Sequence, residues 1–218
     1  MHKLGIPIII LSLLAANTAL AYDNGDFQIW NTDVEEVKVH KNVNFVMEQE
    51  YRFGENATEL YYQHYDFGGV FSFDKMLDLG FFYRQVFERY RKKWRAEDMP
   101  NVNATIKLDL WLFKFEDRNR IEYRHFRYRD DMIRYRNKFA LKLPLDFAKI
   151  KVAPYVSDEI FISSNGTGFN ENRFCAGAEF GLTKYAKADF YYMLKENRIT
   201  GSKWSWANTL GTKVKIAF

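Results

Sequence analysis

Apolar and charged residues alternate along most of this chain, and the alternation limits the folds that it can adopt. In the segment 43–53, Phe45, Met47 and Tyr51 share one parity, whereas Glu48 and Glu50 share the other. Side chains of a β-strand point to opposite faces with period two, so each parity is one face. The same pattern recurs in the segments 77–88, 118–124, 133–143 and 188–195. It predicts either a soluble sandwich with its apolar faces packed together or a membrane barrel with those faces turned to lipid.

The first residues favour the exported alternative. Met1-His2-Lys3 precedes an apolar run from Leu4 to Ala16, and Ala19-Leu20-Ala21 follows. A short basic start, an apolar stretch and an A-x-A ending predict a secretory signal peptide over 1–21, and so a mature domain over 22–218. The apolar run is shorter than the roughly 20 residues that a spanning helix needs.

The last residues favour a barrel. Leu210, Val214, Ile216 and Phe218 fall on one face of a final strand. An apolar face that ends on Phe resembles the signal by which outer-membrane barrels engage their assembly machinery. The aromatic content of 18% suits a barrel with aromatic girdles. We therefore expect an all-β, closed antiparallel transmembrane β-barrel in the outer membrane of a Gram-negative cell.

The strand pattern leaves the number of strands open. Segments of alternating character separated by turn residues are predicted at 26–38, 42–54, 60–73, 76–90, 101–112, 115–128, 132–143, 149–162, 172–184, 186–198 and 206–218. Bacterial single-chain barrels have even numbers of strands. Either the first segment is two strands, which gives twelve, or it lies outside the closed sheet, which gives ten. We favour twelve.

The strand face that carries the charged residues should line a polar, arginine-rich lumen. The predicted lumen-lining residues are Glu48, Glu50, Arg84, Glu88, Arg118, Arg120, Glu122, Arg124, Arg134, Arg136, Lys138, Glu159, Arg173 and Glu179. Burying such ions unpaired costs several kcal/mol each, so they must be paired or hydrated. The favoured interpretation is an ion-pair network that plugs the lumen. The alternative is a narrow aqueous pore whose excess of arginine favours small anions.

A second basic group surrounds one predicted outer loop, beside Trp94. Its members are Arg89, Arg91, Lys92, Lys93 and Arg95. Arginine can pair bidentately with phosphate, so this group is a candidate contact for the phosphates of a surface glycolipid. A solvated basic loop is the alternative. The expected partners are outer-membrane lipid and glycolipid, with the barrel assembly machinery during biogenesis. The net charge of +4 is too mild to indicate a nucleic-acid binder.

No residue pattern predicts catalysis, a metal or a cofactor. Small outer-membrane deacylases resemble one another in placing a His two residues before a nucleophilic Ser. Here Asn42, Asp66 and Arg127 occupy those positions after His40, His64 and His125. Scattered His residues and the single Cys175 do not have metal-ligand spacing. We expect a narrow channel or a structural membrane component. A lipid-directed enzyme, an acyl hydrolase or transferase, is the alternative, and the oligomeric state stays open.

Several segments also resemble a known family. They are DFQIWNT (Asp26–Thr32), EQEYRFG (Glu48–Gly54), ELYYQHYD (Glu59–Asp66), YRQVFE (Tyr83–Glu88), DRNRIEYR (Asp117–Arg124), RYRNK (Arg134–Lys138), PYVSDEIFI (Pro154–Ile162) and NRFCAG (Asn172–Gly177). Together they look like the pattern of the outer-membrane proteins catalogued as domain of unknown function 2490. The resemblance runs from about Phe27 to Phe218, and it implies a barrel without an established activity.

Overall fold

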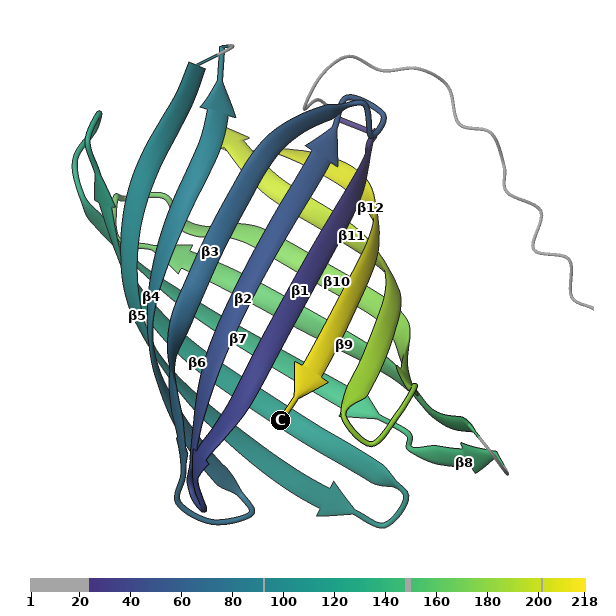
Figure 1. Cartoon of the computed structure of the whole chain (residues 1–218). Coiled ribbons are helices and arrows are strands. Elements are labelled where there is room, and N and C mark those ends of the chain that lie inside the picture. The colour runs from purple at the N-terminus through teal and green to yellow at the C-terminus, as the bar shows by residue number, and fades with distance from the viewer. Residues whose placement is uncertain (1–23, 92, 148–149, 201) are drawn as a thin grey trace, which may run out of the picture.

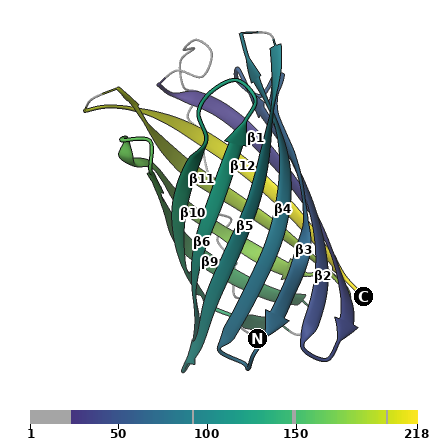
Figure 2. The same cartoon turned by 90° about the vertical axis from the view of Figure 1, so that its left-hand side faces the viewer.

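The alternating segments form strands that wrap into a tilted cylinder (Figures 1 and 2). The computed structural model describes residues 24–91, 93–147, 150–200 and 202–218, and the side chains of 146, 147, 150 and 200 are not described. The predicted signal peptide lies outside the described residues. The strands are β1 (Asp26–His40), β2 (Val43–Gly54), β3 (Glu59–Ser72), β4 (Leu77–Tyr90), β5 (Lys93–Leu110), β6 (Phe113–Phe126), β7 (Met132–Lys142), β8 (Leu145–Phe147), β9 (Ile150–Ser163), β10 (Gly168–Gly181), β11 (Ala186–Thr200) and β12 (Lys203–Ala217).

Eleven of these strands close the barrel, so the expectation of twelve or ten is wrong. Sequential neighbours from β1 to β7 pair antiparallel, as do β7 with β9 and β9 through to β12. The three-residue β8 pairs only with the start of β9. Closure comes from β1 and β12, which run parallel from Asp26 opposite Ala207 to Glu36 opposite Ala217. An even number follows only when the first and last strands are antiparallel, and here they are not.

The β4–β5 hairpin differs most from the predicted strands. The predicted segment begins at 101, whereas β5 begins at Lys93 and pairs with β4 up to Tyr90. Pro100 lies inside β5 opposite Tyr83, and the ladder to β6 passes from Asp98 directly to Asn101. Proline has no N–H to donate, so it interrupts one ladder without ending the strand. The hairpin therefore rises above the neighbouring loops at the top of Figure 1.

The two faces of the wall differ in the way that the period-two pattern predicts. Large apolar side chains are exposed on the outer face, among them Phe45, Phe81, Ile121 and Phe190. On the final strand, Leu210 and Ile216 are exposed on the same side, as is Phe218 just beyond it. Among the residues that the structure describes, nineteen polar or charged ones are buried, far more than an ordinary apolar core contains. The wall thus encloses its charged side chains and leaves its apolar ones outside. No helix within the described residues has the length and apolar character to cross a membrane.

Candidate functional site

The candidate site is the interior of the barrel, because the inward parity of the strands brings the predicted charges together there. Nine of the fourteen predicted residues line a central cavity of about 140 Å³: Glu48, Glu50, Arg84, Arg118, Arg120, Arg136, Lys138, Glu159 and Arg173. Glu88, Arg124 and Arg134 line a second cavity nearer the upper end in Figure 1. Glu122 is fully buried in the wall beside them. Glu179 lies opposite the lumen-lining Asp189 and binds Lys187 at 2.8 Å.

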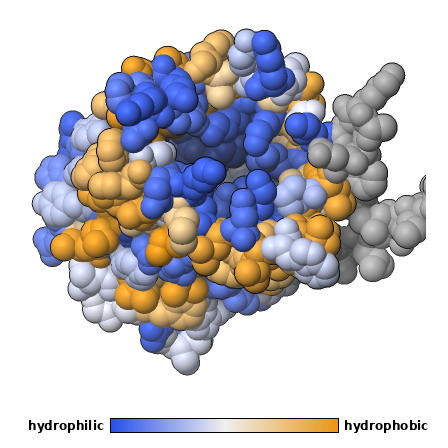
Figure 3. Space-filling view, turned by 90° about the horizontal axis from the view of Figure 1, so that it is seen from below, coloured by the Kyte–Doolittle hydropathy of each residue, from blue (hydrophilic) through white to orange (hydrophobic). Residues whose placement is uncertain are grey.

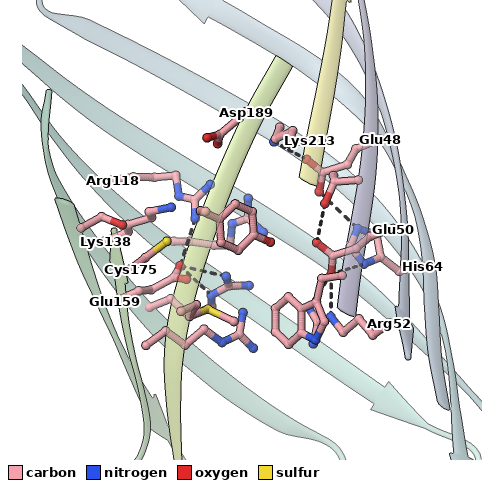
Figure 4. A pocket seen from close by; sticks show the side chains of 18 of the residues that line it. Glu48, Glu50, Arg52, His64, Arg118, Lys138, Glu159, Cys175, Asp189 and Lys213 are labelled. Carbon is pink, nitrogen blue, oxygen red and sulfur yellow. Dashed lines mark hydrogen bonds and ion pairs between the residues drawn. The ribbon is translucent and has the colours of Figure 1, made fainter. Parts of the chain in front are cut away.

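Two ion-pair networks face each other across the central cavity (Figure 4). The first is built on β2, β3, β4 and β12. Arg84 binds Asp66 at 2.6 Å and Glu48 at 3.2 Å, and Lys213 binds the other oxygen of Glu48 at 3.1 Å. The Nε2 atom of His64 also lies 3.2 Å from Glu48. Each carboxylate therefore has a cationic or hydrogen-bonded partner, as the cost of burying charge requires.

The second network lies on β6, β7 and β9. Arg136 reaches both Glu122 and Glu159, each at 2.8 Å. Arg134 binds the other oxygen of Glu122 at 2.5 Å, and Arg118 binds Glu159 at 2.9 Å. The Arg134 and Arg136 bridges tie adjacent strands, whereas the Arg118–Glu159 bridge reaches from β6 across β7 to β9.

Four arginines lie at the boundary between the two cavities, since each of them lines both. They are Arg52, Arg84, Arg136 and Arg173, from β2, β4, β7 and β10. We call this set the arginine ring. Rings of charged side chains set the ion selectivity of pores.

Aromatic side chains of the barrel wall pack against three members of the arginine ring. Trp30 on β1 is 2% exposed, and the guanidinium carbons of Arg52 and Arg173 lie 3.6 Å and 4.9 Å from its ring centroid. Phe161 on β9 is fully buried, and the guanidinium carbons of Arg136 and Arg173 each lie 4.5 Å from its centroid. Cation–π contacts of this kind fix the guanidinium planes without neutralising their charge.

Above the ring lies a cavity of about 600 Å³, which we call the vestibule. Of the described residues that line it, ten are arginine or lysine: Arg52, Arg84, Arg89, Arg124, Arg129, Arg134, Arg136, Arg173, Lys195 and Arg198. Only Glu88 and Glu171 among those lining residues are acidic. Other carboxylates that pair with these cations, such as Glu97 with Arg124 at 2.5 Å, do not line the cavity. The surface that the vestibule presents is therefore strongly cationic.

The opposite end of the barrel is also hollow. Viewed from below, the molecule has a central depression surrounded by hydrophilic residues (Figure 3). The lumen therefore has polar surface at both ends.

The four described basic residues of the predicted outer loop divide between the tip of the β4–β5 hairpin and the rim below it. Arg91 and Lys93 are exposed at the tip of the β4–β5 hairpin, and Lys92 lies outside the described residues. Arg89 pairs with Glu59 on β3. Arg95, opposite Glu88, places its guanidinium carbon 4.1 Å from the ring of Tyr90 and 4.5 Å from that of Tyr128. The strand extension, which the sequence did not predict, pairs Arg89 with Trp94 and Arg95 with Glu88, and both arginines line a rim cavity of about 260 Å³.

Several interior charges were not among the predicted lumen residues. They are Arg52, Asp66, Glu97, Glu171, Asp189, Lys195 and Lys213. Parity carries the signal for them, because Arg52 shares the face of Glu48 and Glu50, and Glu171 shares that of Arg173. Within the described residues, no group of three or more His, Cys, Asp or Glu side chains is placed to hold a metal ion. Cys175 is a buried free thiol that packs against Trp30 and Met193.

The fold and the enclosed charges define the class: this is an eleven-stranded β-barrel with an arginine-rich interior. Residues 27–205 match the family described as "Protein of unknown function (DUF2490)", and the chain belongs to that family. This confirms the resemblance seen in the sequence.

Among solved structures, the beta domain of the Bordetella autotransporter BrkA is similar, with a TM-score of 0.47 and 11% sequence identity. The similarity covers 78% of this chain and 82% of that chain. A comparison with curated proteins found no match.

Proposed function

We propose that this protein is an outer-membrane barrel that forms a narrow, anion-selective channel. The observation that carries the proposal is the arginine ring, which lies between a cationic vestibule and a polar central cavity. An anion entering from the upper end meets guanidinium groups at each level, whereas a cation is repelled. The role needs no catalytic residue.

The outer face supports a membrane location for the barrel. Soluble monomers rarely expose contiguous apolar patches larger than a few hundred Å². Here exposed apolar side chains recur on strand after strand, including Phe67 on β3, Phe81 on β4, Val102 on β5 and Ile121 on β6. Hydrocarbon is the solvent that suits such a wall, and a closed barrel satisfies its own backbone there.

Planar-bilayer recording of the mature chain, residues 22–218, tests the channel. Under a salt gradient we expect steady openings whose reversal potential reports anion preference. Arg134→Glu reverses a vestibule charge and should shift that potential toward cation preference. Lys41→Gln changes a charge in the exposed turn at the other end of the barrel and should leave the potential unchanged.

The other outcomes distinguish the competing roles. Cation preference, or openings that Arg134→Glu leaves unaltered, would contradict an anion channel. A barrel with neither conductance nor enzymatic activity would favour a structural membrane component. A barrel without conductance that releases fatty acid from lipid would favour the lipid-directed enzyme.

We also propose that the final strand is the contact for the barrel assembly machinery. Phe218 extends the β1–β12 ladder, since its N–H donates to the Glu36 carbonyl and its own carbonyl accepts from Lys38. Its side chain is exposed, so Phe218→Ala removes the ring and keeps these backbone bonds. We expect the variant to assemble poorly in cells and to refold normally in detergent. A refolding defect of equal size would indicate that the ring acts in stability and not in recognition.

A further inference from the structure

Two cations of the vestibule have no ion pair with any carboxylate among the described residues. They are Lys195 on β11 and Arg129 in the β6–β7 loop. Arg52, Arg84, Arg134 and Arg173 each have at least one such partner. Lys195 is half-buried, and such charges are normally paired, so an outside anion can supply the charge that Lys195 lacks; Arg129 is exposed at the rim, where an entering anion can reach it.

Lys195 lies at the floor of the vestibule beside a second cation. It is the cross-strand partner of Arg173, and both groups approach the ring of Trp30, at 5.8 Å for the Lys195 ammonium and 4.9 Å for the Arg173 guanidinium. Like charges directly opposite each other on neighbouring strands destabilise a sheet. Glu171, which binds Arg173, offsets part of that repulsion, and an anion held between the two side chains would offset the rest.

Arg129 lies at the mouth. Its guanidinium carbon is 3.7 Å from the ring centroid of Phe126 and 5.7 Å from that of Tyr128. It lines both the vestibule and a neighbouring rim cavity of about 260 Å³, as do Glu88, Arg89 and Tyr90. The two cavities thus adjoin at the rim.

The size and chemistry of this space suit more than a halide ion. Small-molecule sites occupy roughly 300–1,000 Å³, and the vestibule lies within that range at about 600 Å³. Phosphate offers up to two negative charges and three strong acceptor oxygens, which match an arginine fork beside an ammonium. Tyr61, Tyr62 and Trp206 also line the cavity and provide contact surface for an organic group.

We propose that the vestibule is a binding pocket for a phosphate-bearing organic anion, with its phosphate on Lys195 and Arg173 and with Arg129 closing the mouth. This proposal rests on the proposed channel, because it names the class of anion that the channel would bring to the arginine ring. Such a phosphate can belong to a soluble metabolite or to the headgroup of a membrane glycolipid, and the same side chains would recognise either.

Calorimetric titration of pyrophosphate into the mature barrel in neutral detergent tests the pocket. At about 150 mM salt, where surface attraction is screened, we expect saturable binding with one site per barrel. Lys195→Gln should raise the dissociation constant by about 10- to 100-fold, since hydrogen bonds to charged groups contribute that much. Arg129→Gln should act in the same direction, and neither change leaves a carboxylate without its partner. Lys41→Gln, at the other end of the barrel, should bind like the parent chain.

Absence of saturable binding would overturn the pocket, as would equal affinity in the parent chain and both vestibule variants. Competition separates the two sources: displacement of pyrophosphate by vesicles that contain a phosphorylated glycolipid, but not by neutral vesicles, identifies a headgroup. If neither kind of vesicle displaces pyrophosphate, the phosphate belongs to a soluble ligand. The failure of the pocket and that of the channel are distinguishable, because binding in detergent does not require conduction and chloride conduction does not require pyrophosphate binding.

Discussion

The guanidinium carbon of Arg52 lies 3.6 Å from the centroid of the Trp30 ring, and Tyr62 lies 4.0 Å from the same carbon. The guanidinium is thus in contact with two aromatic rings, while its Nε donates to Glu50 at 2.6 Å. Planar stacking and a charge-assisted hydrogen bond together restrict its orientation. A member of the arginine ring is therefore held by the wall before any ion arrives.

Arg52→Met should destabilise the barrel, because it leaves the buried Glu50 without its main counterion. Breaking a buried pair from one side costs about 3–5 kcal/mol. Urea unfolding in detergent, followed by the mobility shift of the folded barrel on unboiled gels, measures the change. The double variant Arg52→Met/Glu50→Leu should recover most of the loss, since replacing both partners by apolar groups is close to neutral. If the double variant is as unstable as the single one, packing on Trp30 and not charge carries the effect.

Gly68→Ala should be far more damaging than Gly69→Ala, although the two glycines are adjacent. A Cβ at Gly68 would lie 2.1 Å from the carbonyl oxygen of Phe81 on β4, a backbone atom that cannot move aside. A Cβ at Gly69 has its nearest neighbour at 3.9 Å, the carbonyl oxygen of Asn44. We expect Gly68→Ala to lose at least about 1–3 kcal/mol in the same urea assay and Gly69→Ala to lose nothing. Equal stabilities would show that β3 and β4 separate without cost.

The loop between β6 and β7 should loosen in acid. Asp131 lies 2.9 Å from His125 Nδ1 and accepts hydrogen bonds from the Tyr123 hydroxyl and the Phe126 N–H. These contacts lower the pKa of Asp131 to about 2. Because the folded-state pKa lies below the unfolded value of about 3.9, the stabilising contribution is complete above pH 4 and is lost as the pH falls toward 2. The protection factor of the Phe126 amide, which is its exchange rate relative to that of an unstructured peptide at the same pH, should therefore fall over that interval. In Asp131→Asn this protection factor should be low at every pH, and a matching acid step in that variant would assign the effect to another group.

The tip of the β4–β5 hairpin should hold surface glycolipid. Replacing Arg89, Arg91, Lys92, Lys93 and Arg95 with Gln should leave assembly intact and lower the glycolipid that co-purifies. Arg91 and Lys93 are the exposed members, so the pair alone should account for much of the loss, at about 1 kcal/mol of attraction for each charge near an anionic surface. Lys41→Gln and Lys75→Gln, in turns at the other end, serve as charge-matched controls. Unchanged co-purification in the five-fold variant would refute the contact.

Parity was the part of this fold that could be predicted from sequence. Glu122 and Ile121 are neighbours in β6, yet one is fully buried and the other is 58% exposed. Alternation of apolar and charged residues predicts this directly, because a strand has only two faces. The family membership could also be predicted, since it rests on segments that can be compared residue by residue.

Height along the barrel could not be predicted in the same way. The four members of the arginine ring share a level because of the stagger between strands that are far apart in the chain, and local sequence does not encode that stagger. The predicted number of strands was wrong for a related reason, since that number depends on whether β12 pairs with β1 in a parallel or an antiparallel way. Pro100 produced the remaining error, because a residue that usually ends a strand lies within β5.

The parallel seam between β1 and β12 has a consequence for how the barrel forms. Almost every other pair in the wall joins strands linked by a short turn, so those pairs can form early from neighbouring segments. The seam joins Asp26 to Ala207, residues from opposite ends of the described chain, and no local contact can guide it. Folding should therefore proceed through an open, curled sheet whose two free margins meet last. Until they meet, those margins are the place where a foreign strand can insert.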